Sequence, residues 1–535
     1  MLGATGWHIP PFAVAADPFG RVAVRPSASS WDFHLMGYEC WVVSMEQKRH
    51  LIVCCDGTWN SAYQSHDGVP TPTNVRLFYN ALADVDDQGR QQKKRYLSGV
   101  GADGSAITRI VDGGTGHGLT YNVMNAYLWL ASTFTHGDRI AAIGFSRGAY
   151  TARLLVGMLG RCGLLRFPQN TAWDQPGARW KAVTRVFEHG YASNRPAGEW
   201  SDGLTFHDGF APHQHAACGS RIELVGVWET VGALGVPDSM AFTSLFDDDE
   251  IRRFYNTHLG AEVGIARHAL ALDEFRATFV PTLWTDPSTE KILPNNERVR
   301  QLWFPGSHSD VGGGYPQTGL SDGALLWMIE EAEATVGLRF DERARGQIHP
   351  RPGDVMHNSC TGLYERMNSA PRAVPRIDAD PTVHHSATER WNDSPIRQDP
   401  YRTTHTLQPG QSVEVEVLAR EPWFPTGLWL EPGTYVFHAT GEWLDRDIPA
   451  GPDGVKKRPW RANLVYSVAE QWGRTETWWR MHKNPEADFL GTKRWESANW
   501  MALIGAVANG AGTKNIDRGT TDTSTSSSDP IRTQR

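Results

Sequence analysis

The stretch IAAIGFSRGAYTARLL, residues 140–155, joins an apolar run to a helical pattern through a G-x-S-x-G turn. A short run that is apolar on both faces is typical of a strand buried in a parallel sheet. In a nucleophile elbow the turn from strand to helix is so sharp that the residues beside the serine must be small. Gly144 and Gly148 meet this requirement. The pattern therefore predicts that Ser146 is a nucleophile at a sheet edge, and the alternative is a serine in an ordinary tight turn.

The segments around this stretch alternate between two periodicities. Short apolar runs that end in glycine-rich or polar turns predict buried strands at residues 50–59, 139–148, 221–232 and 299–314. Helical spacing of apolar residues predicts helices at 122–134, 149–163 and 321–337, the last with Ser321 as its N-cap. Strands alternating with helices indicate an α/β fold, and we expect an α/β-hydrolase-like, mostly parallel sheet with helices on both faces.

Composition excludes several classes of protein. The 535 residues carry a net charge of −8 and show no basic stripe, which argues against nucleic acid as the main partner. No apolar run reaches the ~20 residues of a membrane span. The six cysteines form no C-x-x-C pair, so we expect reduced thiols and synthesis in the cytoplasm. Cys54 and Cys55 should face opposite sides of one strand.

We expect neither a cofactor nor a metal ion. The glycines of GGTGHG (113–118) match no phosphate-binding pattern, and they are interpreted as turn or lid residues. His207, His213 and His215 lie in a polar loop without carboxylates at ligand spacing, so a metal site is not predicted there.

The chain divides into five parts by composition. Residues 1–44 lack the features of a signal peptide, and we interpret them as disordered or as a mis-called start, with Met45 as the physiological start. A catalytic domain at 45–350 is followed by a Pro-, Arg- and Asp-rich linker or lid at 351–404. Alternating residues such as SVEVEVL (412–418) predict a β-sandwich at 405–510, and a Ser/Thr-rich tail at 511–535 should be disordered.

A serine hydroxyl is a weak nucleophile unless a base takes its proton, and in this fold an acid and a histidine follow the serine along the chain. His308, in FPGSHSDVGGGY after the last apolar run, is the predicted base. Glu229, in VGVWETVG at the end of the third run, is the predicted acid. Asp310 and Asp273 are the alternative acids, and Asp310 could instead brace its own loop.

An oxyanion hole needs two backbone amides. The amide of Arg147, directly after the nucleophile, should supply one, and that of Gly57 or Thr58 in CDGTW should supply the other. Asp56 is interpreted as a carboxylate that braces this turn.

Seven motifs occur in order between about residues 48 and 340. They are CDGTWN (55–60), GVGADG (99–104), GGTGHGLTYNVMNAYLWL (113–130), GFSRGAYTAR (144–153), VWETVG (227–232), HALALDEFRATFVPTLW (268–284) and GSHSDVGGGY (306–315). The set resembles an α/β-hydrolase family that includes phospholipase effectors delivered by bacterial type VI secretion.

The resemblance implies a Ser–acid–His triad that hydrolyses phospholipids or related esters at a membrane surface. Ser146 and His308 match the family's nucleophile and base. The family's acid motif usually reads W-D-T, whereas this chain has Glu229, whose extra methylene displaces the carboxylate. The resemblance also implies export without a signal peptide and an immunity protein as partner.

The region 405–510 is similar to galactose-binding lectins of the PA-I type in GEWLDRDIPAGPDG (441–454) and WMALIGAVANG (500–510). This similarity implies glycan binding, to which Trp443, Trp460, Trp478 and Trp479 would contribute.

The sequence thus predicts a serine hydrolase of lipid esters, and the resemblance implies that these are phospholipids. Arg147 and Arg153 could meet a phosphate group or could form salt bridges within the sheet layer. Two alternatives stay open. One is a short-chain carboxylesterase, and the other is a non-catalytic glycan- or membrane-binding protein on a degenerate hydrolase scaffold.

Overall fold

The computed structural model describes most of residues 45–350 and parts of the two ends. The described residues are 12–16, 22–26, 48–57, 65–66, 68–99, 117–168, 173–193, 195–212, 222–231, 258–286, 288–289, 291–362, 364, 369–395, 401, 404–419, 423–445, 448–455, 471, 473–475, 478, 481, 499, 501–508 and 531–532. They fall into two compact units, Met1–Lys48 and Arg49–Arg535.

The first unit contains one described feature, an antiparallel pair of strands. Strand β1 (Phe12–Ala16) pairs with β2 (Val22–Pro26), with Val14 opposite Val24. Both segments lie within residues 1–44, and the interpretation of that range as disordered or as a mis-called start stays a prediction.

The second unit is built on a six-stranded parallel sheet. Its strands are β3 (His50–Cys55), β6 (Gln92–Leu97), β7 (Arg139–Phe145), β8 (Ile222–Trp228), β9 (Val263–Ala271) and β10 (Val299–Phe304), in the order β10-β9-β8-β7-β3-β6. Every neighbouring pair is parallel. The four predicted strands are confirmed, and two strands were not predicted. The edge strand β6 lacks an apolar run, because its sequence QKKRYL is mostly charged or polar. In β9 (VGIARHALA) two polar residues, which the structure buries, interrupt the apolar run.

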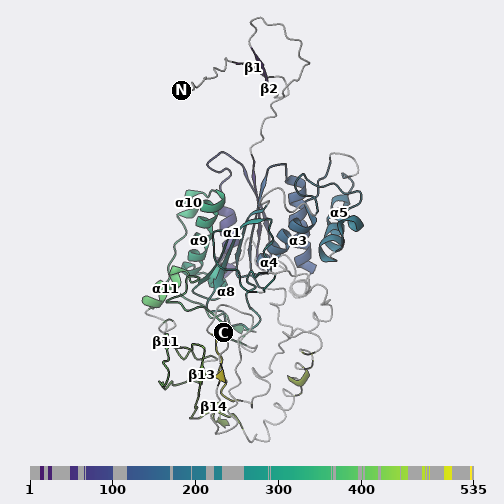
Figure 1. Cartoon of the computed structure of the whole chain (residues 1–535). Helices are drawn as coiled ribbons and strands as arrows, with labels where there is room; N and C mark the ends of the chain where they lie inside the picture. The colour runs from purple at the N-terminus through teal and green to yellow at the C-terminus, as the bar shows by residue number, and fades with distance from the viewer. Residues whose placement is uncertain are drawn as a thin grey trace, which may run out of the picture. The chain divides into compact units, whose positions relative to one another are not determined.

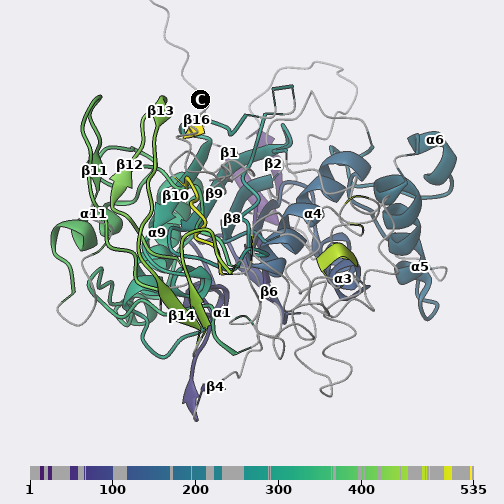
Figure 2. The same ribbon diagram turned by 90° about the horizontal axis from the view of Figure 1, so that it is seen from below.

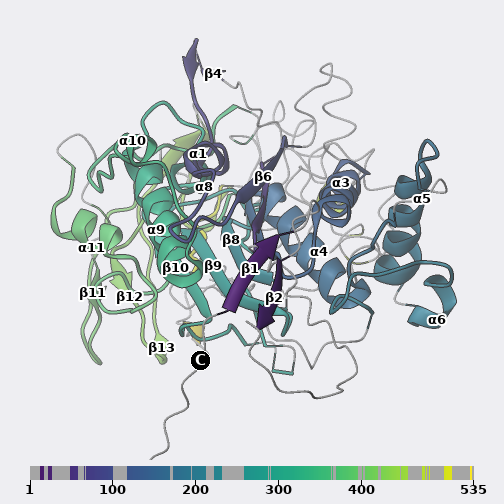
Figure 3. The same cartoon turned by 90° about the horizontal axis from the view of Figure 1, so that it is seen from above.

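Helices cover both faces of this sheet, as Figures 1, 2 and 3 show. One face packs against α3 (His117–Thr133), α4 (Arg147–Cys162), α5 (Ala178–Arg185), the π-helix η1 (Val186–Ala192) and α6 (Ala197–Trp200). The other packs against α1 (Asn74–Ala81), α9 (Gly319–Val336) and α10 (Glu342–Arg345). Cys55 lies in the first core and Cys54 in the second, which confirms that their side chains point to opposite faces.

The start of α9 differs from the prediction. Thr318 is its N-cap, and Ser321 lies inside the first turn with its hydroxyl donating to the carbonyl of Thr318 at 3.0 Å. The prediction of Ser321 as N-cap is wrong because the helix extends two residues further toward its N-terminus, over Gly319 and Leu320, which lack the side-chain cues of a helix start.

The direction in which strands are added to the sheet reverses next to the elbow. After β3 the chain adds β6 on one side of it, and β7 then continues the sheet on the other side. In open parallel sheets, ligands bind outside the carboxyl ends of the strands where the order reverses. Here that point lies between β3 and β7, beside Ser146.

The segment expected as a linker or lid contributes buried side chains to the second unit. Tyr401, Val374 and Ile377 join the cluster of apolar residues around Trp303. Within this segment α11 (His385–Asn392) buries Ala387 in the same cluster. A described part of residues 351–404 is therefore packed against the region of the six-stranded sheet.

Within the described residues beyond 404, only short strand pairs occur. They are β11 (His405–Thr406) with β12 (Leu428–Trp429), β13 (Thr434–Tyr435) with β16 (Ile531–Arg532), and β14 (Trp443–Asp445) with β15 (Ile448–Ala450). The strand predicted at 412–418 is absent, and most of these residues are exposed, because an alternating pattern forms a strand only where another element covers its apolar face. A β-sandwich is not confirmed by these pairs.

Two tryptophans of the predicted glycan site are described. The indole of Trp443 donates to the carbonyl of Met501 at 2.9 Å, and Trp478 is half-exposed. Trp460 and Trp479 lie outside the described residues. Glycan binding stays a prediction.

Among the residues that the structure describes, no helix is both long enough and apolar enough to cross a membrane.

Candidate active site

The elbow holds Ser146 in a strained backbone conformation. Ser146 follows β7 directly and is the N-cap of α4, with φ 56° and ψ −124°. Non-glycine residues rarely adopt a positive φ, and such strain persists where the surrounding structure imposes it. The serine side chain makes no capping hydrogen bond to the helix. An ordinary cap would use that bond, so the structure favours the elbow over a turn serine.

Close backbone contacts explain the two glycines. A Cβ on Gly144 would lie 2.4 Å from the carbonyl oxygen of Gly148, at the start of α4. A Cβ on Gly148 would lie 2.2 Å from the carbonyl oxygen of Cys55, at the end of β3. Both obstacles are backbone atoms, so the strand and the helix can approach each other only if these positions carry no side chain.

His308 lies in the turn after β10, at the start of the short helix α8 (His308–Gly312). Its ring packs between two phenylalanines, with a centroid distance of 4.7 Å to Phe145 and 5.0 Å to Phe279. Phe145 is the residue before Ser146, so the same side chain that ends β7 supports the histidine ring. His308 is buried, and burial lowers the pKa of its imidazole below the ordinary value.

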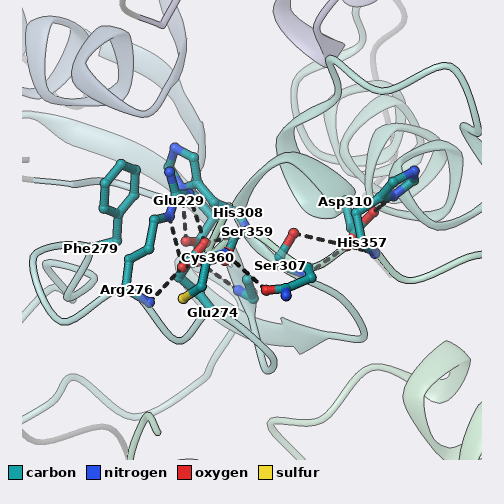
Figure 4. Close-up of polar contacts among 12 residues, drawn as sticks. Glu229, Glu274, Arg276, Phe279, Ser307, His308, Asp310, His357, Ser359 and Cys360 are labelled. Atoms are coloured by element: carbon teal, nitrogen blue, oxygen red, sulfur yellow. Dashed lines mark hydrogen bonds and ion pairs between the residues drawn. The ribbon is translucent and has the colours of Figure 1, made fainter. Parts of the chain in front are cut away.

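Glu229 follows β8 and contacts His308 (Figure 4). Its Oε2 lies 3.0 Å from His308 Nδ1. Glu229 also has a positive φ, 46°, and the carbonyl of Trp228 accepts a hydrogen bond from the amide of Ser146 at 3.1 Å. The two strained turns are therefore joined by a backbone hydrogen bond.

The remaining hydrogen bonds to the Glu229 carboxylate come from the Arg372 guanidinium and a backbone amide. Arg372 donates to both carboxylate oxygens, at 2.9 and 2.8 Å, and the amide of Ala271 donates to Oε1 at 2.6 Å. Burial opposes ionisation of Glu229, but the charge of Arg372 and the hydrogen bonds from Arg372 and His308 outweigh it and hold its pKa well below the ordinary value.

The alternative acids have other partners. Asp310 accepts from the amide and the hydroxyl of Ser307, both at 2.9 Å, and pairs with His357 Nδ1 at 2.6 Å. Asp273 accepts from the amide of Gly306 at 2.8 Å and from the hydroxyl of Tyr401 at 3.0 Å. Both carboxylates brace loops around the site, whereas Glu229 contacts the imidazole.

The turn after β3 is held by Asp56. This carboxylate accepts from the amide of Gly57 at 2.7 Å, the hydroxyl of Thr73 at 2.7 Å and the hydroxyl of Tyr96 at 2.6 Å, as expected of a bracing residue. Burial raises its pKa to about 6. The amide of Gly57 would have to leave Asp56 to bind an oxyanion, and Thr58 lies outside the described residues.

Arg147, on the other side of the elbow, is the first residue of α4, where backbone amides lack intrahelical acceptors. Its side chain is half-buried, and burial lowers its pKa to about 10, so it is positively charged at neutral pH. Arg153 instead donates to the carbonyl of Thr282 and lies over the Trp284 ring at 5.1 Å, which is a structural role.

Sequence reasoning missed a set of residues that surround His308 (Figure 4). Glu274 accepts from the amide of His308 at 3.2 Å and from the hydroxyl of Ser359 at 2.7 Å, and it pairs with Arg276 at 2.8 Å. Burial opposes ionisation of Glu274, but Arg276 lowers its pKa to about 2. The motif HALALDEFR contains both residues, so it carried a usable signal. No sequence signal pointed to Arg372, because it lies in a stretch without periodicity.

Among the described residues, no group of three or more His, Cys, Asp or Glu side chains could hold a metal ion. His207 packs its ring on Phe134 at 4.9 Å, while His213 and His215 lie outside the part of the chain that the structure describes.

A parallel sheet with helices on both faces, and a strained serine at its carboxyl edge, defines an α/β-hydrolase-like protein. The chain belongs to the family of type VI secretion phospholipase effectors of the Tle1-like type, whose catalytic-domain model matches residues 49–331. Membership of this family supports a lipid-hydrolase function.

Other similarities are more distant. An uncharacterized Saccharomyces cerevisiae protein, YEL023C, is 28% identical over 254 residues, which cover 44% of this chain and 33% of that protein. An uncharacterized protein from Pseudomonas aeruginosa has a TM-score of 0.32 at 18% identity, over 57% of this chain and 49% of that one. The Tle1 effector bound to the VgrG spike of the type VI secretion system has a TM-score of 0.28 at 15% identity, over 58% of each chain. The match thus spans about a third of the length of the yeast protein. It spans 49% of the Pseudomonas aeruginosa protein and 58% of the Tle1 effector chain.

Proposed function

We propose that this protein hydrolyses carboxylic ester bonds of phospholipids through Ser146, His308 and Glu229. The observation that carries the proposal is the hydrogen bond between His308 and Glu229, at 3.0 Å, at the edge of the sheet where the elbow lies. A carboxylate that binds Nδ1 leaves Nε2 of the same imidazole as the proton acceptor.

The chemistry follows from these roles. Ser146 Oγ attacks the ester carbonyl while His308 accepts the hydroxyl proton, and a tetrahedral intermediate forms. His308 returns the proton to the leaving alcohol, and an acyl-enzyme remains. Water then attacks the acyl group, with His308 again as base, and releases the fatty acid. Glu229 stabilises the imidazolium in both steps and stays ionised, which its lowered pKa supports.

The amide of Arg147 and one amide from the turn of Gly57 and Thr58 would stabilise the oxyanion. One such donor contributes about 10²–10³-fold in rate. Because Gly57 donates to Asp56 at 2.7 Å, the Thr58 amide is the better candidate for the second donor.

Arg147 favours an anionic lipid over a neutral ester. Arg147 follows the nucleophile directly in the sequence, is half-buried and is positively charged at neutral pH. A phosphate group attached near the scissile ester would meet this charge. The family assignment supports the same substrate class.

The test compares hydrolysis of phospholipid vesicles and of p-nitrophenyl acyl esters by the wild type and by Ser146→Ala. Ser193→Ala is the control, because Ser193 is an exposed serine after η1 whose hydroxyl donates to the carbonyl of Glu188. We expect activity and fluorophosphonate labelling that Ser146→Ala abolishes and Ser193→Ala retains. Activity that survives Ser146→Ala contradicts the proposal, and activity on short esters alone favours a carboxylesterase.

An effector role, with delivery out of the cell that makes it, is part of the proposal and rests on the family. Directing the protein to a bacterial periplasm should inhibit growth, and Ser146→Ala should remove the inhibition. Inhibition that the variant retains would show that toxicity does not depend on hydrolysis.

A further inference from the structure

We propose that Arg372 is a positioning residue for the catalytic base, because it fixes the carboxylate that orients His308. The inference rests on the proposed function, in which His308 accepts the proton of Ser146. Arg372 does not contact the reacting atoms in this mechanism, and it acts through Glu229.

The guanidinium is locked in place from two sides. Nη1 donates to Glu229 Oε1 at 2.9 Å and to the carbonyl of Ala271 at 2.7 Å. Nη2 donates to Glu229 Oε2 at 2.8 Å and to the carbonyl of Phe279 at 2.5 Å. A planar fork held by two backbone carbonyls presents its remaining protons in one fixed geometry, which matches a carboxylate.

The carboxylate depends on this fork. Oε2 of Glu229 binds both Arg372 and His308 Nδ1, while Oε1 binds Arg372 and the amide of Ala271. A glutamate side chain has several rotatable bonds, and these four contacts select one rotamer. Without Arg372, the buried carboxylate would keep only two of its four donors, and its orientation toward the imidazole would be less restricted.

Arg372 also balances the charges around His308. Glu229 at the end of β8 and Glu274 after β9 are negative, and Arg276 and Arg372 are positive. Asp310 lies on the same short helix as the histidine but pairs with His357. His268 on β9, which also faces Glu229, has its pKa lowered to about 3 by burial and is neutral. Removing Arg372 leaves an excess of negative charge, which favours the imidazolium form of His308.

The experiment measures kcat/KM for a p-nitrophenyl ester as a function of pH, together with the rate of fluorophosphonate labelling. The variants are Arg372→Gln, which removes the charge, and Arg372→Lys, which keeps the charge but not the fork. Arg390→Gln is the matched control, because Arg390 is a buried arginine of the same segment that donates to the carbonyls of Pro352 and Asp354.

We expect Arg372→Gln to lower kcat/KM by about 100-fold, as a displaced catalytic group does. Its acid limb should move up by about one pH unit, because the base is protonated more easily. Arg372→Lys should lower kcat/KM by a factor similar to that of Arg372→Gln. The acid limb of its pH profile should stay close to that of the wild type. Arg390→Gln should lower the melting temperature without moving the acid limb.

A folded Arg372→Gln variant with the acid limb and rate of the wild type overturns the inference. If that variant does not fold, Arg372→Lys decides, since a wild-type rate in it would show that the fork is dispensable. These results require Ser146-dependent labelling of the wild type. If Ser146→Ala leaves labelling and hydrolysis intact, the proposed function itself is rejected, which is a separate outcome.

Discussion

The ring of Phe145 packs against the ring of His308, with their centroids 4.7 Å apart and an interplanar angle of 34°. Phe145 ends β7 and precedes Ser146, whereas His308 begins α8 after β10. The side chain before the nucleophile therefore sets the position of the base. Gly312, in the same short helix, has no Cβ because one would lie 1.9 Å from the Phe145 ring.

Phe145→Ala should both destabilise the fold and slow the reaction. Loss of this buried ring leaves a cavity, and such substitutions cost about 3 to 5 kcal/mol in the free energy of unfolding. The His308 ring loses one of its two aromatic supports, so kcat should fall more than KM changes. Urea unfolding and steady-state kinetics test the two effects. A variant that is destabilised but keeps the wild-type kcat would show that Phe145 only fills the core.

Gly148→Ala should destabilise the protein, because its Cβ would lie 2.2 Å from the Cys55 carbonyl oxygen. The obstacle is backbone, so the strand and the helix must separate, and we expect a loss of about 1 to 3 kcal/mol. Gly198→Ala is the matched control, since a Cβ there meets nothing within 4 Å and Gly198 lies in α6. That control should be neutral or stabilise by about 0.5 kcal/mol. Equal melting temperatures for both variants would contradict the close approach at the elbow.

Glu229→Gln should lower kcat by about 10⁴-fold, the magnitude typical of a triad acid converted to an amide. It should also cost about 3 to 5 kcal/mol of stability, because Arg372 keeps a buried charge without its counter-ion. Asp310→Asn and Asp273→Asn remove the alternative acids, and each should lower kcat far less. Kinetics of the three variants at one pH make the comparison. A larger loss of kcat in Asp310→Asn or Asp273→Asn would move the acid role away from Glu229.

The activity should persist below the pH at which a free histidine titrates. His308 must be neutral to accept a proton, and burial lowers its pKa from the ordinary 6.5, although the hydrogen bond to Glu229 opposes the shift. The acid limb of kcat/KM should therefore lie below pH 6.5. The same sign applies to stability, because the unfolded state binds more protons and stability is lost as the pH falls below 6.5. A pH profile and acid unfolding test this, and an acid limb above 6.5 would contradict it.

Four strands and the elbow could be predicted because their signals are local. An apolar run predicts a buried strand by itself, and two small residues around a serine predict a sharp turn by steric reasoning alone. Strands β6 and β9 lacked such signals, since β6 is a charged edge strand and β9 buries the polar pair Arg267 and His268. The alternating residues 412–418 show the opposite case, in which a strand pattern has no partner that would make it a strand.

The sequence by itself indicated Ser146 and His308 and gave Glu229 as one of three candidate acids, because each lies at or shortly after the end of a strand that its apolar pattern reveals. Only the tertiary structure shows which of these carboxylates contacts His308, since that contact depends on the positions of neighbouring strands in the sheet. The tertiary structure also reveals that Arg372 binds Glu229, although it lies 143 residues further along the chain in a segment with no periodic pattern. Charge pairing over such a separation is set by how the chain packs, and no local property of the sequence encodes it.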